Sequence, residues 1–199
     1  MTDWEQRYRE GNTPWDKGTP APELAAALAD GLFAGRVLVP GCGMGHDVRA
    51  IAMGAAVREV VGLDVAPSAV AGARRLGGVS GVRFEQGDLF ALPEGWEGAG
   101  FDWVWEHTCF CAIAPAFREA YVEAVWRVLR PGGHLLAIFY LDPGLDPGEE
   151  GPPHGVSLAE LDLLFGRRFQ LEREWAPRGA YPGREGREWV RLLRRREGE

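Results

Sequence analysis

A short strand-like run that leads directly into three closely spaced glycines restricts the fold of this chain more than any other feature. Residues Arg36–Pro40 form a short run rich in β-formers, and Gly41-Cys-Gly-Met-Gly45 follows it at once. Beyond the glycines, apolar residues recur at helical spacing from Val48 to Ala55. The pattern predicts a strand, a glycine turn and a helix, the opening unit of an α/β domain.

Strand-like and helix-like segments alternate along the rest of the chain. Runs rich in apolar and β-branched residues predict strands at residues 60–65, 82–85, 101–106, 134–141, 169–175 and 188–194. Helical spacing predicts helices at residues 67–76, 117–129 and 157–165. We therefore expect an α/β fold with a doubly wound, mostly parallel seven-stranded sheet, whose last two strands make an antiparallel edge.

The predicted helices carry three local expectations. Phe117 should lie on the apolar face of its helix, together with Tyr121 and Val125. The run Pro131–Gly133 should end that helix before the next strand begins. Ser157 and the glutamate at position 160 have the spacing of a capping box.

Length and composition narrow the classes of function. The 199 residues are expected to form one domain, residues 1–199, and the longest apolar run, Leu135–Leu141, is too short to span a membrane. The N-terminal residues do not resemble a secretory signal, so we expect a cytoplasmic protein. A net charge of -7 makes nucleic acid a poor partner. Three cysteines are too few for a disulfide framework, and no ligand spacing predicts a metal site.

Ligand-binding residues in such a sheet are expected just after the carboxyl ends of the strands. Gly41 and Gly43 lack a Cβ, so a ligand can approach the backbone of their turn closely. Asp64 and Asp88 end the next two strands, where a carboxylate can accept hydrogen bonds from ribose hydroxyls. A turn or helix cap is the alternative role for each aspartate. Three consecutive strand ends of this kind favour a nucleoside ligand.

The spacing of the glycines argues against a dinucleotide. The dinucleotide fingerprint is GxGxxG, whereas the third glycine here, Gly45, comes one residue early. Asp47 follows it closely and would repel a pyrophosphate. A nicotinamide-dependent oxidoreductase and a non-catalytic nucleoside-binding module are the alternatives from other classes.

Several segments together resemble the class I S-adenosylmethionine-dependent methyltransferases, and within them the thiopurine methyltransferase-like family with its thiol and halide methyltransferases. The likeness covers nearly the whole chain. It is carried by residues 4–8 and 11–16 (WEQRY and GNTPWD), 39–47 (VPGCGMGHD), 101–113 (FDWVWEHTCFCAI) and 151–154 (GPPH). The stretch EHTCFCAI is far more specific than the glycine turn.

The resemblance implies a Rossmann-like methyltransferase fold, S-adenosylmethionine as the cofactor, and a set of contacts to it. In addition to Gly43 of the glycine turn, the implied cofactor-binding residues are Trp4, Tyr8, Trp15, Gly41, Asp64, Asp88, Leu89 and His107. Two positions depart from the family pattern: relatives often carry Trp at position 8, and Tyr or Arg at position 107. The contact made by His107 is therefore expected to differ in charge and hydrogen bonding.

The N-terminal aromatic residues have an independent reason to lie near a sulfonium. A sulfonium cation is attracted to the faces of aromatic rings, and Trp4, Tyr8 and Trp15 could supply such faces. We expect residues 1–30 to form a lid over the cofactor. The alternative is a hydrophobic staple that only holds an N-terminal helix against the domain.

Methyl transfer from a sulfonium to an anion cancels charge as the transition state forms, so an apolar pocket with little water favours the reaction. The sequence assigns no catalytic residue. His107 could remove a proton from a neutral thiol, although a contact with the cofactor is the preferred reading, and Glu106 is the other nearby acceptor. His46 and His134 are expected to be structural.

The substrate side is expected to include a loop at residues 142–156, which is too long for a simple connection. The predicted substrate-facing residues are Trp15, Phe110, Tyr140 and His154. We expect a small-molecule substrate with a soft nucleophile, and we favour a thiol or another sulfur acceptor. Halide, metalloid, oxygen and nitrogen acceptors are alternatives on the same scaffold. The sequence leaves the oligomeric state open.

Overall fold

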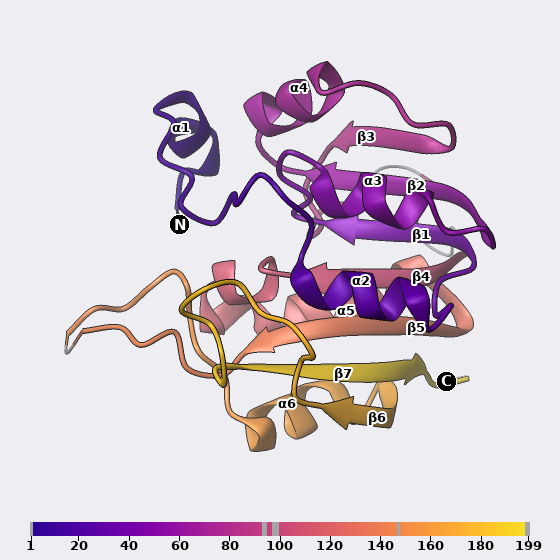
Figure 1. Ribbon diagram of the computed structural model, residues 1–199. Helices are drawn as coiled ribbons and strands as arrows, with labels where there is room; N and C mark the ends of the chain where they lie inside the picture. Colours follow the sequence, from indigo (N-terminus) through magenta and orange to yellow (C-terminus); the bar gives the residue numbers. More distant parts are fainter. Residues whose placement is uncertain (1, 93–94, 97–99, 147, 198–199) are drawn as a thin grey trace.

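The computed structural model describes residues 2–92, 95–96, 100–146 and 148–197, and it contains one seven-stranded sheet (Figure 1). The strand order is β3-β2-β1-β4-β5-β7-β6. The strands are β1 (Gly35–Pro40), β2 (Val57–Asp64), β3 (Val82–Gln86), β4 (Phe101–His107), β5 (Leu129–Tyr140), β6 (Phe169–Trp175) and β7 (Glu188–Arg195). Strands β1 to β5 pair in parallel, and β7 pairs antiparallel with both β5 and β6. The predicted doubly wound sheet with an antiparallel edge is confirmed.

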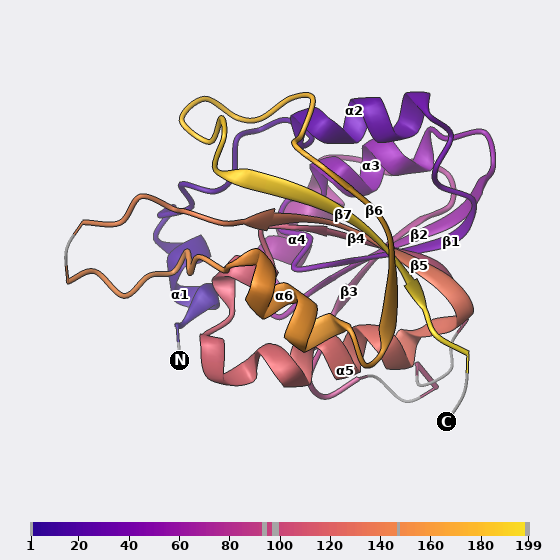
Figure 2. The same cartoon turned by 90° about the horizontal axis from the view of Figure 1, so that it is seen from below.

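Helices cover both faces of the sheet (Figure 2). The helices are α1 (Trp4–Arg9), α2 (Pro22–Ala29), α3 (His46–Ala52), α4 (Pro67–Arg75), α5 (Arg118–Val128) and α6 (Leu158–Phe165), with short 3-10 turns at Phe110–Ala112 and Pro115–Phe117. Residues of α2, α3 and α4 form one buried apolar cluster with the sheet, and residues of α5 and α6 form the other. No helix in the described part of the chain is long and apolar enough to cross a membrane.

Three local predictions about the helices need correction. Phe117 is 42% exposed and packs against Phe90, because α5 begins only at Arg118 and turns its apolar face to the sheet from Tyr121 onward. The run Pro131–Gly133 does not separate helix from strand: α5 ends at Val128, and β5 begins at once with an irregular pairing opposite β4. Gly132 has φ +71°, a conformation that suits such an irregularity.

Only one of the two hydrogen bonds of the predicted capping box of α6 forms. Ser157 accepts a hydrogen bond from the backbone N–H of Glu160 at 3.1 Å, as predicted. The carboxylate of Glu160 accepts a hydrogen bond from Arg118 at 2.6 Å instead of turning back to the helix start. The buried Arg118 therefore links α5 to α6. This contact joins residues far apart in sequence, which is why the local pattern did not indicate it.

Candidate active site

The glycine turn after β1 is open to a ligand because Gly41 and Gly43 carry no side chains that would cover its backbone. Gly41 and Gly43 have φ values of +57° and +52°, where residues with a Cβ are strained. A Cβ on Gly41 would lie 2.9 Å from Cys109 Sγ, and one on Gly43 would lie 2.8 Å from the hydroxyl oxygen of Tyr8. The turn therefore needs glycine at both positions, and it leaves backbone atoms at the carboxyl edge of the sheet.

Asp64, the last residue of β2, fastens this turn. Its carboxylate accepts hydrogen bonds from the backbone N–H of Gly43 at 2.8 Å and from that of Ala66 at 2.9 Å. The side chain is buried, and burial raises its pKa above the ordinary value although the backbone N–H groups partly offset this. Each carboxylate oxygen has a second lone pair, so Asp64 can still accept hydrogen bonds from a ligand.

The N-terminal aromatic residues gather beside the glycine turn and already bind a cation. Trp15 meets Trp4 and Tyr8 edge to face, with ring centroids 5.3 and 5.8 Å away, and its indole N–H donates to the Tyr8 hydroxyl at 3.1 Å. The guanidinium of Arg7 lies 4.8 Å from the centroid of the Trp15 ring. No residue of α1 is fully buried, so its aromatic rings pack against Trp15 outside the core of the domain.

Helix α1 is fastened to the rest of the protein through a polar contact. The carboxylate of Glu5 accepts hydrogen bonds from the backbone N–H of Ser68 at 2.9 Å and from its hydroxyl at 2.7 Å. Ser68 lies at the start of α4, where a carboxylate is also favoured by the helix dipole. These hydrogen bonds lower the pKa of Glu5, so the contact persists as an ionised one near neutral pH.

His107, at the end of β4, is paired with Asp47, which is partly buried. Asp47 accepts hydrogen bonds from the backbone N–H of Ala21 and the indole N–H of Trp105, both at 2.7 Å. His107 Nδ1 lies 3.6 Å from the same carboxylate oxygen that accepts from Trp105, an ion-pair distance slightly too long for a hydrogen bond. Burial raises the pKa of Asp47, but its neighbours His107, Trp105 and Ala21 outweigh this and hold it below the ordinary value.

The turn that follows His107 has a strained backbone, and hydrogen bonds to a buried carboxylate hold it in place. Thr108 has φ +66°, which is unusual for a β-branched residue and marks a backbone held by its surroundings. Glu106 holds it: one carboxylate oxygen accepts from the backbone N–H groups of Cys109 and Phe110 at 3.0 and 2.8 Å, and the other accepts from the Tyr121 hydroxyl at 2.5 Å. Glu106 is fully buried, so it is an anchor of the turn and faces no substrate.

We expect Glu106→Gln to change how stability depends on pH. Burial raises the pKa of Glu106 above its ordinary 4.5, and its hydrogen bonds offset this only in part. Between the ordinary pKa and the raised pKa of the folded state, the folded protein binds more protons than the unfolded chain. The contribution of Glu106 to the free energy of unfolding therefore falls as pH rises. Glutamine does not titrate, so the variant does not show this fall. Its free energy of unfolding, relative to that of the wild type, should rise with pH by at most about 1.4 kcal/mol per pH unit.

Urea unfolding of both proteins from pH 4.5 upward measures this difference. A difference that does not change with pH would contradict the assignment of a raised pKa to Glu106.

A small hollow of about 60 Å³ lies at the carboxyl edge, and it brings together five of the predicted site residues. These are Tyr8, Trp15, Gly41, Gly43 and His107. The other described residues that line it are Asp16, Lys17, Thr19, Val39, Cys42, Met44, His46, Asp47, Thr108 and Tyr181. Trp4 packs on Trp15, and Asp64 lies behind the glycine turn, so both are adjacent to the hollow.

The remaining predicted site residues lie elsewhere in the described structure. Asp88 is exposed and accepts a hydrogen bond from the backbone N–H of Phe90, and Leu89 is 8% exposed within the core cluster. Phe110 is 1% exposed and packs among aromatic rings of the core, so its side chain does not reach the hollow. Tyr140 lies under the guanidinium of Arg184, and the backbone N–H of His154 donates to the Cys111 carbonyl.

Sequence reasoning missed two residues of this site. Asp47 served only as an argument against a pyrophosphate, whereas in the structure it lies against His107. Tyr181 belongs to the loop between β6 and β7; its ring centroid lies 5.8 Å from that of His107, and its hydroxyl donates to the Thr19 carbonyl at 2.6 Å. No local pattern in the sequence indicates either contact, because both join distant segments.

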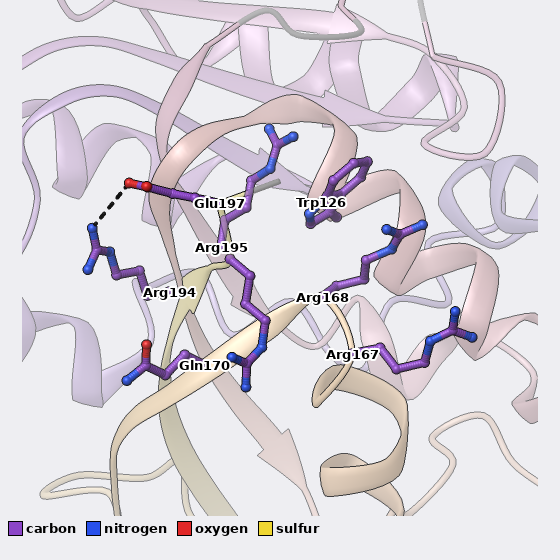
Figure 3. A pocket seen from close by; sticks show the side chains of 8 residues that line it. Trp126, Arg167, Arg168, Gln170, Arg194, Arg195 and Glu197 are labelled. Carbon is purple, nitrogen blue, oxygen red and sulfur yellow. Dashed lines mark ion pairs between the residues drawn. The ribbon is translucent and has the colours of Figure 1, made fainter. Parts of the chain in front are cut away.

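A larger hollow of about 610 Å³ lies at the opposite edge of the sheet (Figure 3) and has a structural explanation. It is lined by Trp126, Arg167, Arg168, Gln170, Arg194, Arg195, Arg196 and Glu197. The guanidinium groups of Arg168 and Arg195 each lie 4.2 Å from the centroid of the Trp126 ring. Arg168 also pairs with Glu123 of α5 at 2.9 Å. These contacts join the end of β7 to α5, and none of the predicted site residues lies there.

The three cysteines are free thiols, as predicted. Burial raises the pKa of Cys111 to about 12 and raises those of Cys42 and Cys109 well above the ordinary value. Within residues 2–92, 95–96, 100–146 and 148–197, no group of three or more His, Cys, Asp or Glu side chains is placed to hold a metal ion.

The protein is a class I S-adenosylmethionine-dependent methyltransferase. Its mostly parallel sheet, open glycine turn, acidic residue at the end of the second strand and aromatic rings beside the turn agree with this class. The sequence profile of the thiopurine S-methyltransferase (TPMT) family matches residues 1–178, and the chain belongs to this family. The family resemblance and the cofactor expected from the sequence are confirmed.

Individual relatives agree with this assignment. A probable thiol methyltransferase 2 of Arabidopsis thaliana is 37% identical over 168 residues, covering 81% of this chain and 70% of that protein. Thiocyanate methyltransferase 1 of the same plant is 35% identical over 193 residues, covering 93% and 81%. Among solved structures, one reported for the conversion of a disulfide bond into a thioacetal group during echinomycin biosynthesis has a TM-score of 0.78 and 27% identity, covering 98% and 92%.

Proposed function

We propose that this methyltransferase transfers the methyl group of S-adenosylmethionine to a small thiol or another sulfur acceptor. The observation that carries the proposal is the hollow at the carboxyl edge, where the glycine turn meets an aromatic cluster that already binds the cation of Arg7. Relatives named thiol and thiocyanate methyltransferases support sulfur as the nucleophilic atom. The oxidoreductase alternative has no support in these comparisons.

The residues near the hollow fit the chemistry of this cofactor. The backbone of Gly41 and Gly43 would lie along it, and Asp64 would accept hydrogen bonds from its ribose hydroxyls. Trp4, Tyr8, Trp15 and His107 would surround its charged end, while Asp88 and Leu89 follow β3 and would contact its base. When bound, the cofactor supplies a methyl group on a positively charged sulfur, which keeps the electron pair of the broken bond.

The N-terminal segment would have to move when the cofactor binds. Sites for molecules of this size have volumes of roughly 300–1,000 Å³, much larger than the present hollow. The aromatic cluster and the Tyr8 hydroxyl close the space over the glycine turn, whereas Glu5 fastens α1 to α4. Residues 1–30 would therefore act as a lid that turns about the contact between Glu5 and Ser68.

The substrate would enter from the side of the loop at residues 142–156. Trp15 and Tyr181 line the hollow, and Tyr140 and His154 lie near the end of β5 and in this loop. Phe110 no longer belongs to the proposed set, because its ring is in the core. We further propose that residues 1–199 form one domain, that the protein acts in the cytoplasm, and that its partners are small molecules, with no role for nucleic acid or a membrane.

Calorimetric titration with S-adenosylmethionine and with NADH, followed by incubation with labelled cofactor and a panel of thiols, tests the proposal. We expect heat only with S-adenosylmethionine and a labelled thioether as the product. Heat only with NADH would overturn the cofactor assignment. Cofactor binding without any methylated product would indicate a binding module.

We expect Trp15→Ala to weaken binding of S-adenosylmethionine by about 0.5–2 kcal/mol, because the cation loses one aromatic face. Titration calorimetry measures the change. Trp126→Ala, at the opposite edge of the sheet, is the matched control and should leave the affinity within about twofold. Equal effects of the two substitutions would show that Trp15 acts only through stability.

A further inference from the structure

A histidine lines the hollow, and one of its ring nitrogens lies against a carboxylate. Nδ1 of His107 faces the carboxylate of Asp47 at 3.6 Å, and the two nitrogens of an imidazole point in different directions. Nε2 is therefore directed away from Asp47. A neutral imidazole with its proton on Nδ1 keeps a lone pair on Nε2, and that is the form in which it can accept a proton.

Asp47 is held in place by two donors, with its carboxylate beside the ring of His107. The carboxylate has two strong donors, Ala21 N–H and Trp105 N–H at 2.7 Å, so its oxygen atoms cannot turn away from the histidine. Its low pKa keeps it ionised at neutral pH. A fixed negative charge beside Nδ1 favours the proton on that nitrogen, and it also stabilises the imidazolium that forms when Nε2 accepts a proton.

The other titratable groups around the hollow are poorer proton acceptors. Burial raises the pKa values of the Tyr8 and Tyr181 hydroxyls, so both stay protonated near neutral pH. Cys42 is held in its thiol form by burial as well. The remaining charged residues that line the hollow are Asp16, paired with His46 at 3.2 Å, and the side chain of Lys17. Among these lining residues, His46 and its partner Asp16 are the rival proton acceptors.

We propose that His107 is the catalytic base of this site, that Asp47 is its positioning residue, and that the acceptors are thiols which enter as neutral molecules. This inference rests on the proposed function. The S–H proton passes to Nε2 of His107, and the electron pair left on the acceptor sulfur forms the new bond to the methyl carbon while the old bond breaks. His107 then releases its proton to solvent.

The charge around the hollow favours a neutral substrate over an anion. Asp47 and Asp16 line it, and Asp64 lies just behind the glycine turn. An entering thiocyanate or halide ion would meet these three carboxylates, against two nearby cations: Lys17, which lines the hollow, and Arg7, whose guanidinium lies against Trp15. A neutral thiol does not meet that barrier, provided that a base inside the site removes its proton.

Comparison of two acceptor types in His107→Gln tests the role of the base. A protonated aliphatic thiol needs the base, whereas iodide and thiocyanate carry their charge already. We expect kcat for the thiol to fall on the order of 100-fold at neutral pH and to recover as pH rises and free thiolate accumulates. Any loss of the residual iodide rate, which reports the contact of His107 with the cofactor, should be much smaller and should not depend on pH. His134→Gln, which removes a histidine stacked on Trp103 away from the hollow, is the control.

The other possible results contradict either this proposal or the proposed function. An equal fall for thiol and iodide would assign His107 to cofactor binding and overturn the proposal, and so would an unchanged thiol rate. The proposal also fails if His46→Gln rather than His107→Gln causes the selective loss. If the wild type methylates no acceptor at all, it is the proposed function that fails.

Nitrogen NMR of the imidazole rings in the cofactor-free protein gives a readout independent of turnover. We expect neutral His107 to carry its proton on Nδ1, and Asp47→Asn to shift the ring toward the other tautomer. The same variant should lower kcat for the thiol much more than its KM. A wild-type ring protonated on Nε2 would overturn the role of Asp47.

Discussion

Replacing Glu106 by alanine is expected to lower the free energy of unfolding by about 3–5 kcal/mol. The substitution removes one carboxylate but leaves three buried donors without an acceptor: the backbone N–H groups of Cys109 and Phe110 and the hydroxyl of Tyr121. It also removes the anchor that holds Thr108 at φ +66°. Urea unfolding at neutral pH, followed by circular dichroism, measures the effect.

Tyr121→Phe is the matched control for this prediction. It removes one of the three donors and leaves the backbone contacts of Glu106 in place, so its cost should be about 1–2 kcal/mol. A loss below about 1 kcal/mol for Glu106→Ala would mean that the turn after β4 is held by something other than this carboxylate.

Asp64→Ala is expected to weaken binding of S-adenosylmethionine by about 1–3 kcal/mol. Two losses combine: the ribose would lose a charged acceptor, and the backbone N–H of Gly43 would lose the partner that fixes the glycine turn. Titration calorimetry measures the affinity, and thermal unfolding shows whether the variant is folded at the temperature used.

Asp102→Ala provides the comparison for Asp64→Ala. Asp102 lies near the start of β4, at the other edge of the sheet, and its carboxylate pairs with Arg130 at 2.7 Å. Its replacement should leave cofactor affinity within about twofold. If both aspartates weaken binding to the same extent, the effect reflects general destabilisation and Asp64 has no direct part in the site.

The fold could be predicted from the sequence because its signals are local. Each buried parallel strand is a short apolar run, and the turn after β1 shows its conformation through glycines that no other residue can replace. The element boundaries are less local. Phe117 has an apolar side chain at a helical position, yet the helix begins one residue later, and its ring meets Phe90 instead of the core.

The candidate site could be predicted only in part, because some of its contacts join segments that are distant in the sequence. Tyr8, Trp15, Gly41, Gly43 and His107 belong to recognisable segments, and they meet at one hollow. The direction of a side chain in an irregular turn depends on contacts with distant residues. Phe110 lies only three residues after His107, but its backbone N–H is bound by Glu106 and its ring packs into the core.

The cysteines beside the glycine turn have a consequence for an enzyme that alkylates sulfur. Cys42 lines the hollow, and Cys109 Sγ lies against Gly41 of the glycine turn, so both are neighbours of any reactive methyl donor. A thiol is a weak nucleophile until it loses its proton, and burial keeps these two protonated far above neutral pH. The protein is thereby protected from methylating itself, and a substitution that admits water or a cation beside either sulfur would weaken this protection.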